Sequence, residues 1–203
     1  MKSTDPAHIG DQYVFIGIDA NLKAIISYRV GKRDGENANA FLADLRRRIV
    51  NRPEISSDGF SSYLEAIERS FGADCSYGQV IKQYHGEPPV DTARRYSPGV
   101  VVGVRRHRLI GYQRRVCTSY VECGNLSMRM ASRRFTRLTS GFSKKLANHI
   151  AAVNLYVAHF NLCRVHEALR ITPAMAIGVT DHLCTIGELI DEALAQSIEQ
   201  QAA

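Results

Sequence analysis

The sequence predicts an α/β fold in which a small mixed sheet is flanked by helices. Three observations lead to this expectation. Two β-rich apolar runs follow one another near the N-terminus, residues 35–84 alternate between helical and extended patterns, and residues after 118 are mostly helical. A length of 203 residues suits one domain with a sizeable core. We expect a main domain over 1–170 and a helical tail over 171–203.

The first strands are predicted at Tyr13–Asp19 and Ala24–Val30, and the short polar segment between them suits a hairpin turn. A helix is expected next, because Ala38, Phe41, Leu42, Leu45 and Ile49 recur at helical spacing before Pro53 ends the pattern. A short strand at 54–57, a helix at 61–71 and a strand at 77–84 follow.

The second half of the chain begins with an irregular stretch at 87–113, in which we expect only a short strand at 100–104. The basic cluster Arg105-Arg106-His107-Arg108 is therefore predicted to lie in a loop. Helices are expected from Thr118 to a break near 139–141, over 143–169, and over 186–198.

Composition excludes several classes of protein. No apolar run approaches the ~20 residues needed to cross a bilayer, and the polar first residues lack the apolar core of a secretory signal. We therefore expect a cytoplasmic, nucleoid-associated protein without a membrane partner. The five cysteines never form a C-x-x-C pair, which argues against a disulfide framework and a cysteine-rich zinc finger. No glycine-rich phosphate-binding motif is present.

Positive charge is concentrated in one quarter of the chain. Residues 94–145 contain thirteen Lys or Arg residues and a single acid, Glu122, although the net charge of the whole chain is only +6. Such a segment favours a polyanionic partner over a merely solvated basic face. Double-stranded DNA is the partner that we predict. The DNA-contacting residues are predicted to be Arg105, Arg106, Arg108, Arg129, Arg133, Arg134 and Arg137.

Two carboxylates are candidates for chemistry. Asp58 follows a short predicted strand and precedes Gly59, so it suits a ligand-binding strand end, although an Asp-Gly pair is also an ordinary turn. Glu122 lies near a helix start, where it would otherwise only favour the helix dipole. Helical spacing places Arg129 and Arg133 on the side of Glu122. The opposite, core-facing side is predicted to hold Met128, Ala131, Phe135 and Leu138.

A third group of residues could in principle bind zinc. His159, Cys163 and His166 are spaced so that they share one helix face. No fourth ligand is visible and the surrounding sequence, AAVNLYVAHFNL, is typical of a core helix, so core packing is the preferred interpretation. Tyr156 and Phe160 are likewise expected to be core residues.

Two long stretches resemble a known family. TSYVECGNLSMRMASRRFTRLTSGFSKKLANHIAAVNLYVAHFNLCRVHEAL with TPAMAIGVTD resembles the end of the catalytic domain in transposases of the insertion-sequence-one family. GIDANLKAIISYRVGKRDGENANAFLADLRRRI and SSDGFSSYLEAI resemble the middle of that domain. The resemblance implies a ribonuclease H-like fold and a reaction of DNA cleavage and strand transfer. The implied cofactor is Mg²⁺ (or Mn²⁺), held by an Asp, Asp, Glu triad.

On this resemblance Asp58 is the second aspartate and Glu122 the glutamate of the triad, and both are metal ligands. The sequence departs from the family pattern at Cys123 and Gly124, where an arginine usually follows the glutamate. The segment that carries the first aspartate and its strand is not found, so we expect the fold to lack its first strand. Asp19 matches a turn aspartate of the family and is disfavoured as a substitute.

Two functions therefore remain open on the sequence. The chain is either a transposase domain that acts on element ends and target DNA, or a truncated remnant that binds DNA without cutting it. In either case the implied protein partner is a second copy of the chain or a full-length transposase. Because the first aspartate is missing, whether this chain is an active enzyme is also left open.

Overall fold

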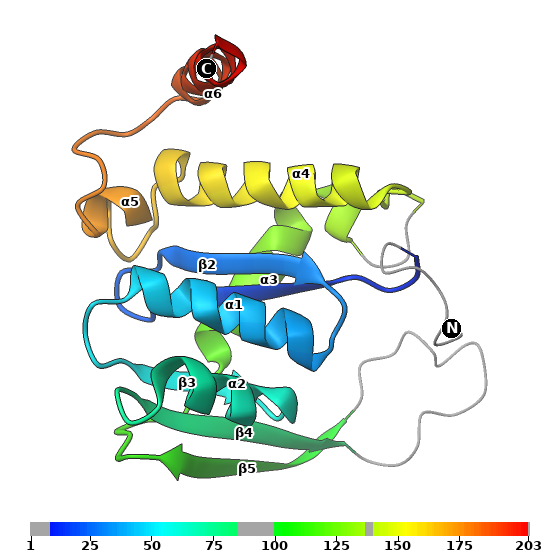
Figure 1. The fold of residues 1–203 in the computed structure, drawn as a ribbon, viewed down its shortest axis with the longest axis vertical. Helices are drawn as coiled ribbons and strands as arrows, with labels where there is room; N and C mark the ends of the chain where they lie inside the picture. Colours follow the sequence, from blue (N-terminus) through cyan, green and yellow to red (C-terminus); the bar gives the residue numbers. More distant parts are fainter. Residues whose placement is uncertain (1–8, 85–99, 137–139, 203) are drawn as a thin grey trace. The chain divides into compact units, whose positions relative to one another are not determined.

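The computed structural model describes residues 9–84, 100–136 and 140–202 (Figure 1). The fold is mixed α/β, with a small mixed sheet and flanking helices, as the sequence predicted. The chain divides into two compact units: the first combines the described parts of Met1–Lys32 and Tyr120–Ala203, and the second is Arg33–Ser119. The boundary expected at residue 170 stays a prediction.

The first unit contains the predicted hairpin. β1 (Tyr13–Ile18) pairs with β2 (Ile25–Gly31) in antiparallel register as a two-stranded sheet. Backbone bonds from Asp19 to Ala24 and from Lys23 to Asp19 close the turn. Lys23 adopts a φ of 59°, the left-handed conformation that tight turns require.

Two helices of the first unit, α3 and α4, are shorter than predicted. α3 (Ser119–Ala131) stops at Ser132, whose extended backbone starts a separate 3-10 turn, η2 (Arg133–Phe135). The Ser132 hydroxyl accepts a hydrogen bond from the backbone N–H of Arg134, so a capping bond replaces the next helical turn. The prediction of one helical face carrying both Arg129 and Arg133 was therefore wrong.

The expected helix over 143–169 is also divided. α4 (Leu146–Ala158) continues into a π-helical turn, η3 (His159–Cys163), which ends at Arg164. The apolar residues that predicted this helix are buried: Val153, Tyr156, Val157 and Phe160 face the core. They form one apolar cluster with Ile25 of β2 and Met128 of α3, which confirms Tyr156 and Phe160 as core residues.

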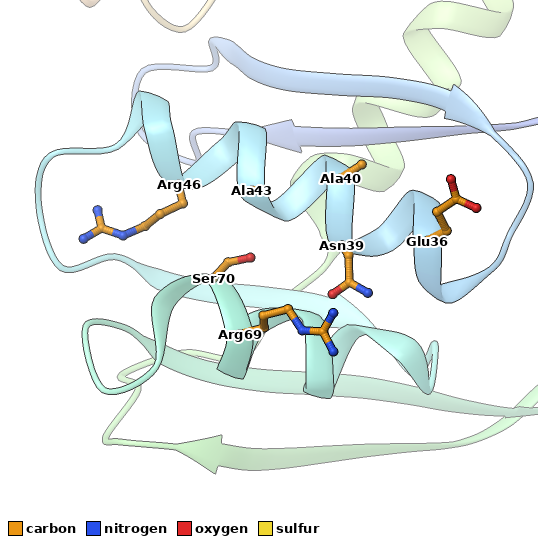
Figure 2. A pocket seen from close by; sticks show the side chains of 7 residues that line it. All are labelled: Glu36, Asn39, Ala40, Ala43, Arg46, Arg69 and Ser70. Carbon is orange, nitrogen blue, oxygen red and sulfur yellow. The ribbon is translucent and has the colours of Figure 1, made fainter.

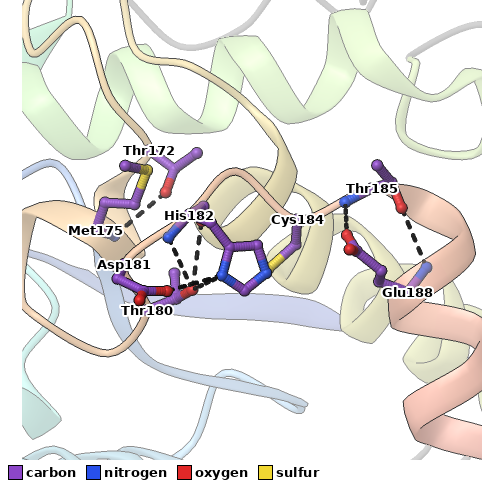
Figure 3. Close-up of polar contacts among 8 residues, drawn as sticks. All are labelled: Thr172, Met175, Thr180, Asp181, His182, Cys184, Thr185 and Glu188. Carbon is purple, nitrogen blue, oxygen red and sulfur yellow. Dashed lines mark hydrogen bonds and ion pairs between the residues drawn. The ribbon is translucent and has the colours of Figure 1, made fainter.

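Two further helices follow. α5 (Pro173–Ala176) is one short turn whose buried cap, Thr172, accepts a hydrogen bond from the N–H of Met175. α6 (Ile186–Ala202) begins with reciprocal hydrogen bonds between Thr185 and Glu188, a capping box that satisfies two backbone donors (Figure 3). The predicted last helix over 186–198 is confirmed and extends slightly further.

The second unit holds a three-stranded sheet in the order β3-β4-β5. β3 (Glu54–Asp58) and β4 (Ser76–Tyr84) are parallel, joined by α2 (Ser62–Phe71), and α1 (Gly35–Arg48) packs against α2. The buried side of α1 consists of Ala38, Phe41, Leu42 and Leu45, four of the five apolar residues whose spacing predicted the helix. Ile49, the fifth, is the C-cap.

The third strand corrects the prediction of a loop. β5 (Val101–Ile110) runs antiparallel to β4 over its whole length, so Arg105, Arg106 and Arg108 lie in a strand. Charged residues have weak β propensity, but the edge of β4 offers a row of backbone hydrogen bonds that outweighs it. None of the helices in the described ranges is long and apolar enough to cross a membrane.

Candidate functional site

Asp58 occupies the last position of β3, and its carboxylate is already engaged. The Arg33 guanidinium lies 3.0 Å from Oδ2, and the backbone N–H of Phe60 donates to Oδ1 at 3.3 Å. The Asp58 side chain is 59% exposed and that of Arg33 45% exposed. An ion pair so open to water contributes less than about 1 kcal/mol, so another cation could displace Arg33 at little cost.

An aromatic layer supports this strand end. The Arg33 guanidinium lies 4.8 Å from the ring centre of Phe60, and Phe60 meets Tyr63 edge to face at 5.2 Å. Burial, and secondly the negative charge of Asp58, raises the pKa of Tyr63. Burial also raises the pKa of Tyr77, whose hydroxyl shares a 2.7 Å hydrogen bond with Ser57. Both phenols are therefore neutral hydrogen-bonding groups at neutral pH.

Glu122 lies in the first turn of α3 and is exposed. The start of this helix sits beside the β1–β2 turn. The Lys23 ammonium lies 4.1 Å from the centre of the Tyr120 ring, and a Cβ added at Gly124 would lie 3.8 Å from Ile18. The structure thus brings the glutamate and the hairpin turn into the same part of the first unit.

Asp19 stands in that hairpin turn, with its carboxylate directed at the backbone. Its Oδ1 atom accepts hydrogen bonds from the N–H groups of Asn21 and Leu22, both at 2.7 Å. This is an Asx turn, in which the carboxylate stabilises the reversal of the chain. The geometry gives Asp19 a structural task, in keeping with its match to a turn aspartate.

Asp58 and Glu122 are the two carboxylates predicted to share a metal ion. Asp58 and Glu122 belong to different compact units, so their assignment as joint metal ligands stays a prediction. Among the described residues, no group of three or more His, Cys, Asp or Glu side chains could hold a metal ion. His159 and Cys163 lie in the π-helical turn, which alters their expected helical spacing, and His166 lies beyond it.

A basic surface lies along the edge strand of the second unit. Arg106 and Arg108 project from the same face of β5, and their Nε atoms donate to the backbone carbonyls of Val116 and Gln113 at 3.2 and 2.9 Å. These bonds fix the inner part of each guanidinium and leave its outer N–H groups available. Arg105 projects from the other face of the strand and is exposed.

The surface continues past the strand. Tyr112 is 78% exposed and lies 5.8 Å from the Arg108 guanidinium, and Arg114 and Arg115 are exposed. We call this set the β5 surface: Arg105, Arg106, Arg108, Tyr112, Arg114 and Arg115. Within the described ranges, none of its guanidinium groups forms an ion pair with a carboxylate, although the backbone N–H of Arg114 donates to the Glu54 carboxylate at 3.2 Å. The sequence-based prediction omitted its last three members, although the spacing Tyr-x-Arg-Arg directly after a basic strand could have indicated them.

The other predicted DNA contacts lie in the first unit or outside the described residues. Arg129 is exposed on α3, and Arg134 donates to the Ser143 hydroxyl at 3.1 Å from the turn η2. Arg133 precedes it in the same turn. Arg137 lies outside the described residues.

A shallow hollow of about 710 Å³ lies between α1 and α2 (Figure 2). Its two arginines already have partners: Arg46 contacts Asp74 at 3.5 Å and the Ile49 carbonyl at 3.0 Å, and Arg69 contacts Glu65 at 2.9 Å. Both arginines of the hollow are thus already engaged, and no function is assigned to it.

No protein-family model, curated protein or solved structure matches the chain.

Proposed function

We propose that the chain is part of the catalytic domain of an insertion-sequence transposase and that it binds duplex DNA through the β5 surface. The observation that carries the DNA-binding part is the row of arginines on β5 without carboxylate partners in the described structure. The transposase part rests on the sequence resemblance. The order of hairpin, helix, parallel strands and connecting helix is compatible with a ribonuclease H-like arrangement.

The chemistry of arginine explains why this surface suits DNA. A guanidinium presents several N–H donors in a planar fork that matches phosphate oxygens. The Nε bonds of Arg106 and Arg108 hold their guanidinium groups in place before a ligand arrives, which lowers the entropy lost on binding. Tyr112 adds an exposed ring beside them. Because such contacts address the backbone, binding is expected to be largely independent of base sequence.

DNA binding can be measured by fluorescence anisotropy with a labelled duplex over a range of salt concentrations. The affinity should fall linearly on a logarithmic plot, with a slope near −0.9 per phosphate neutralised. The double variant Arg105→Ala/Arg115→Ala should weaken binding to all sequences and reduce the slope by about 2 units.

The matched control is Arg47→Ala/Arg69→Ala. It removes two positive charges from helices of the same unit, where each arginine already pairs with a neighbouring carboxylate. Equal loss of affinity in both double variants, or binding that salt does not affect, would show that the β5 surface is not the DNA-binding site.

The role proposed for the carboxylates is separate from DNA binding. Asp58 and Glu122 would supply oxygen ligands for Mg²⁺ or Mn²⁺ if the two units bring them together. The missing first aspartate predicts that this chain does not complete transposition, and any nicking by the wild-type chain of DNA carrying element ends with Mn²⁺ should be lost in Asp58→Asn and in Glu122→Gln. The control Glu65→Gln, at an exposed position of α2, should retain any such nicking.

The runner-up function is a DNA-binding remnant that does not cut, acting as an inhibitor of the full-length enzyme or having no function. It is favoured by the Arg33 guanidinium, which occupies the place where a cation would meet Asp58. DNA binding by the wild-type chain without nicking under any metal condition would select this alternative. Nicking that survives both carboxylate substitutions would instead reject the site assignment.

A further inference from the structure

The segment that leads into α6 places a thiol, an imidazole and a carboxylate in sequence (Figure 3). Cys184 Sγ lies 3.8 Å from Nε2 of His182, and Nδ1 of the same ring lies 2.9 Å from Oδ1 of Asp181. The Thr180 hydroxyl lies 3.2 Å from the same Nδ1 atom and accepts from the backbone N–H of His182 at 3.4 Å. The Asp181 carboxylate and the Thr180 hydroxyl thus both contact Nδ1 of the ring.

The orientation of the ring matters for the thiol. When Nδ1–H donates to the Asp181 carboxylate, Nε2 of the neutral imidazole carries the lone pair and faces Cys184. The hydrogen bond to Asp181 is the main cause of a raised pKa at His182, so the ring is a stronger base than a free imidazole. Cys184, His182 and Asp181 are thus arranged as a nucleophile, its base and the acid that orients the base, an arrangement that activates cysteine nucleophiles.

A second thiol lies on the neighbouring backbone. The N–H of Cys184 donates to the carbonyl of Leu162 at 3.2 Å, and Cys163 is the next residue. Burial first, and then the nearby Cys184 and Glu188, raises the pKa of Cys163. Cys163 therefore remains a protonated thiol beside the more exposed segment that carries Cys184.

We propose that Cys184 is a nucleophilic cysteine that hydroperoxides oxidise, with His182 as its base and Cys163 as the thiol that resolves the product to a disulfide. This site is independent of the β5 surface and of the carboxylates. None of the DNA contacts proposed above uses these residues.

The reaction balances in two steps. His182 takes the thiol proton, the Cys184 thiolate attacks one peroxide oxygen, and the O–O bond breaks. The departing oxygen takes the proton from His182, which leaves a sulfenic acid and water, or an alcohol from an organic hydroperoxide. The Cys163 thiol then attacks the sulfenic sulfur, the S–O bond breaks, and water leaves as the Cys163–Cys184 disulfide forms. The peroxide is reduced by two electrons and the two thiols are oxidised.

The test treats the full chain with dilute hydrogen peroxide and follows each cysteine by peptide mass spectrometry. Cys123 is an internal control, because it is exposed and forms no hydrogen bond with a histidine in the described part of the chain. Cys184 should be oxidised about tenfold faster than Cys123, because Nε2 of His182 lies 3.8 Å from Cys184 Sγ and can take the proton of that thiol. The first product should be the Cys163–Cys184 disulfide.

Variants separate the roles. His182→Asn should bring the rate at Cys184 down to that of Cys123, and Cys163→Ser should stop the reaction at a sulfenic acid that dimedone captures. Circular dichroism checks that each variant folds. Equal rates at Cys184 and Cys123 in the wild type, or an unchanged rate in a folded His182→Asn chain, would overturn the nucleophile assignment. Accumulation of sulfinic acid without a disulfide would overturn the role of Cys163.

Discussion

At the residue scale, His149 of α4 shows how burial without a partner affects stability. Its Nε2 atom is buried, and no hydrogen-bond partner reaches it among the described residues. The ring instead meets Phe135 edge to face, with 5.5 Å between the ring centres. Burial lowers the pKa of His149 below the ordinary value of 6.5, because a charged imidazolium would lose its hydration. The fold therefore favours the neutral ring.

We expect the free energy of unfolding to decrease as the pH falls from 6.5 through the lowered pKa of folded His149. The sign follows from proton binding, since over this window the unfolded chain takes up the proton more readily than the folded chain. Urea denaturation at several pH values between about 5 and 7.5 measures the slope. His149→Gln should flatten it, whereas His182→Gln should steepen it, because the hydrogen bond to Asp181 raises the pKa of His182 and so gives a slope of the opposite sign. The same slope in wild type and His149→Gln would contradict the assignment.

The candidate carboxylates show what single residues reveal in a sequence. A strand pattern followed by Asp58 is enough to place an acid at a strand end, and a turn pattern is enough to place Asp19 in a turn. The partner of Asp58 could not be predicted in this way. Arg33 lies 25 positions earlier, between a strand and a helix, and meets Asp58 only through the packing of the second unit.

At the scale of elements, two glycines differ in how closely neighbouring atoms pack around them. Gly124 lies inside α3, and a Cβ there would meet Ile18 at 3.8 Å, an ordinary contact. Gly78 lies in β4, and a Cβ there would come within 2.5 Å of Gln113, 2.7 Å of Val116 and 2.9 Å of the His107 backbone carbonyl. The first glycine leaves room for a methyl group, and the second does not.

Gly124→Ala should therefore stabilise the chain by about 0.5–1 kcal/mol, because alanine loses less conformational entropy in a helix than glycine. Gly78→Ala should destabilise it by about 1–3 kcal/mol, because the crowded neighbours must shift. Thermal or urea unfolding of the pair provides both values. A lower stability in Gly124→Ala would show that α3 packs against β1 more tightly than the structure indicates.

Element types were easier to predict than element ends. Apolar spacing identified α1, α2 and α6, because the apolar residues of each helix form one continuous stripe along it. The end of α3 depended on a single hydroxyl of Ser132, and the length of β5 depended on pairing with β4, so neither had a periodic pattern. The basic cluster changed from a predicted loop to a strand for this reason.

At the scale of the whole molecule, the chain leaves the first unit after Lys32 and returns to it at Tyr120. The first unit must therefore join segments that are far apart in the sequence. Asn161 of η3 makes one of these connections with its side-chain amide: it donates to the carbonyl of Ile25 at 2.9 Å and accepts from the N–H of Ile25 at 3.0 Å. Local patterns could not reveal this pairing, because the two residues are 136 positions apart.

Asn161→Leu should destabilise the first unit by at least about 2 kcal/mol, because it leaves both polar backbone groups of Ile25 half-buried without a partner, at about 1–3 kcal/mol for each such group. Asn161→Asp should cost less, since a carboxylate keeps the acceptor for the Ile25 N–H and loses only the donor. Asn154→Leu, at an exposed position of α4, is the control for adding an apolar side chain. Urea unfolding gives the free energies, and amide exchange at Ile25 reports the bond directly. Rapid exchange in Asn161→Leu with unchanged exchange in Asn154→Leu is the expected result. If both variants leave the exchange rate and the stability unchanged, Asn161 does not hold the two segments of the first unit together.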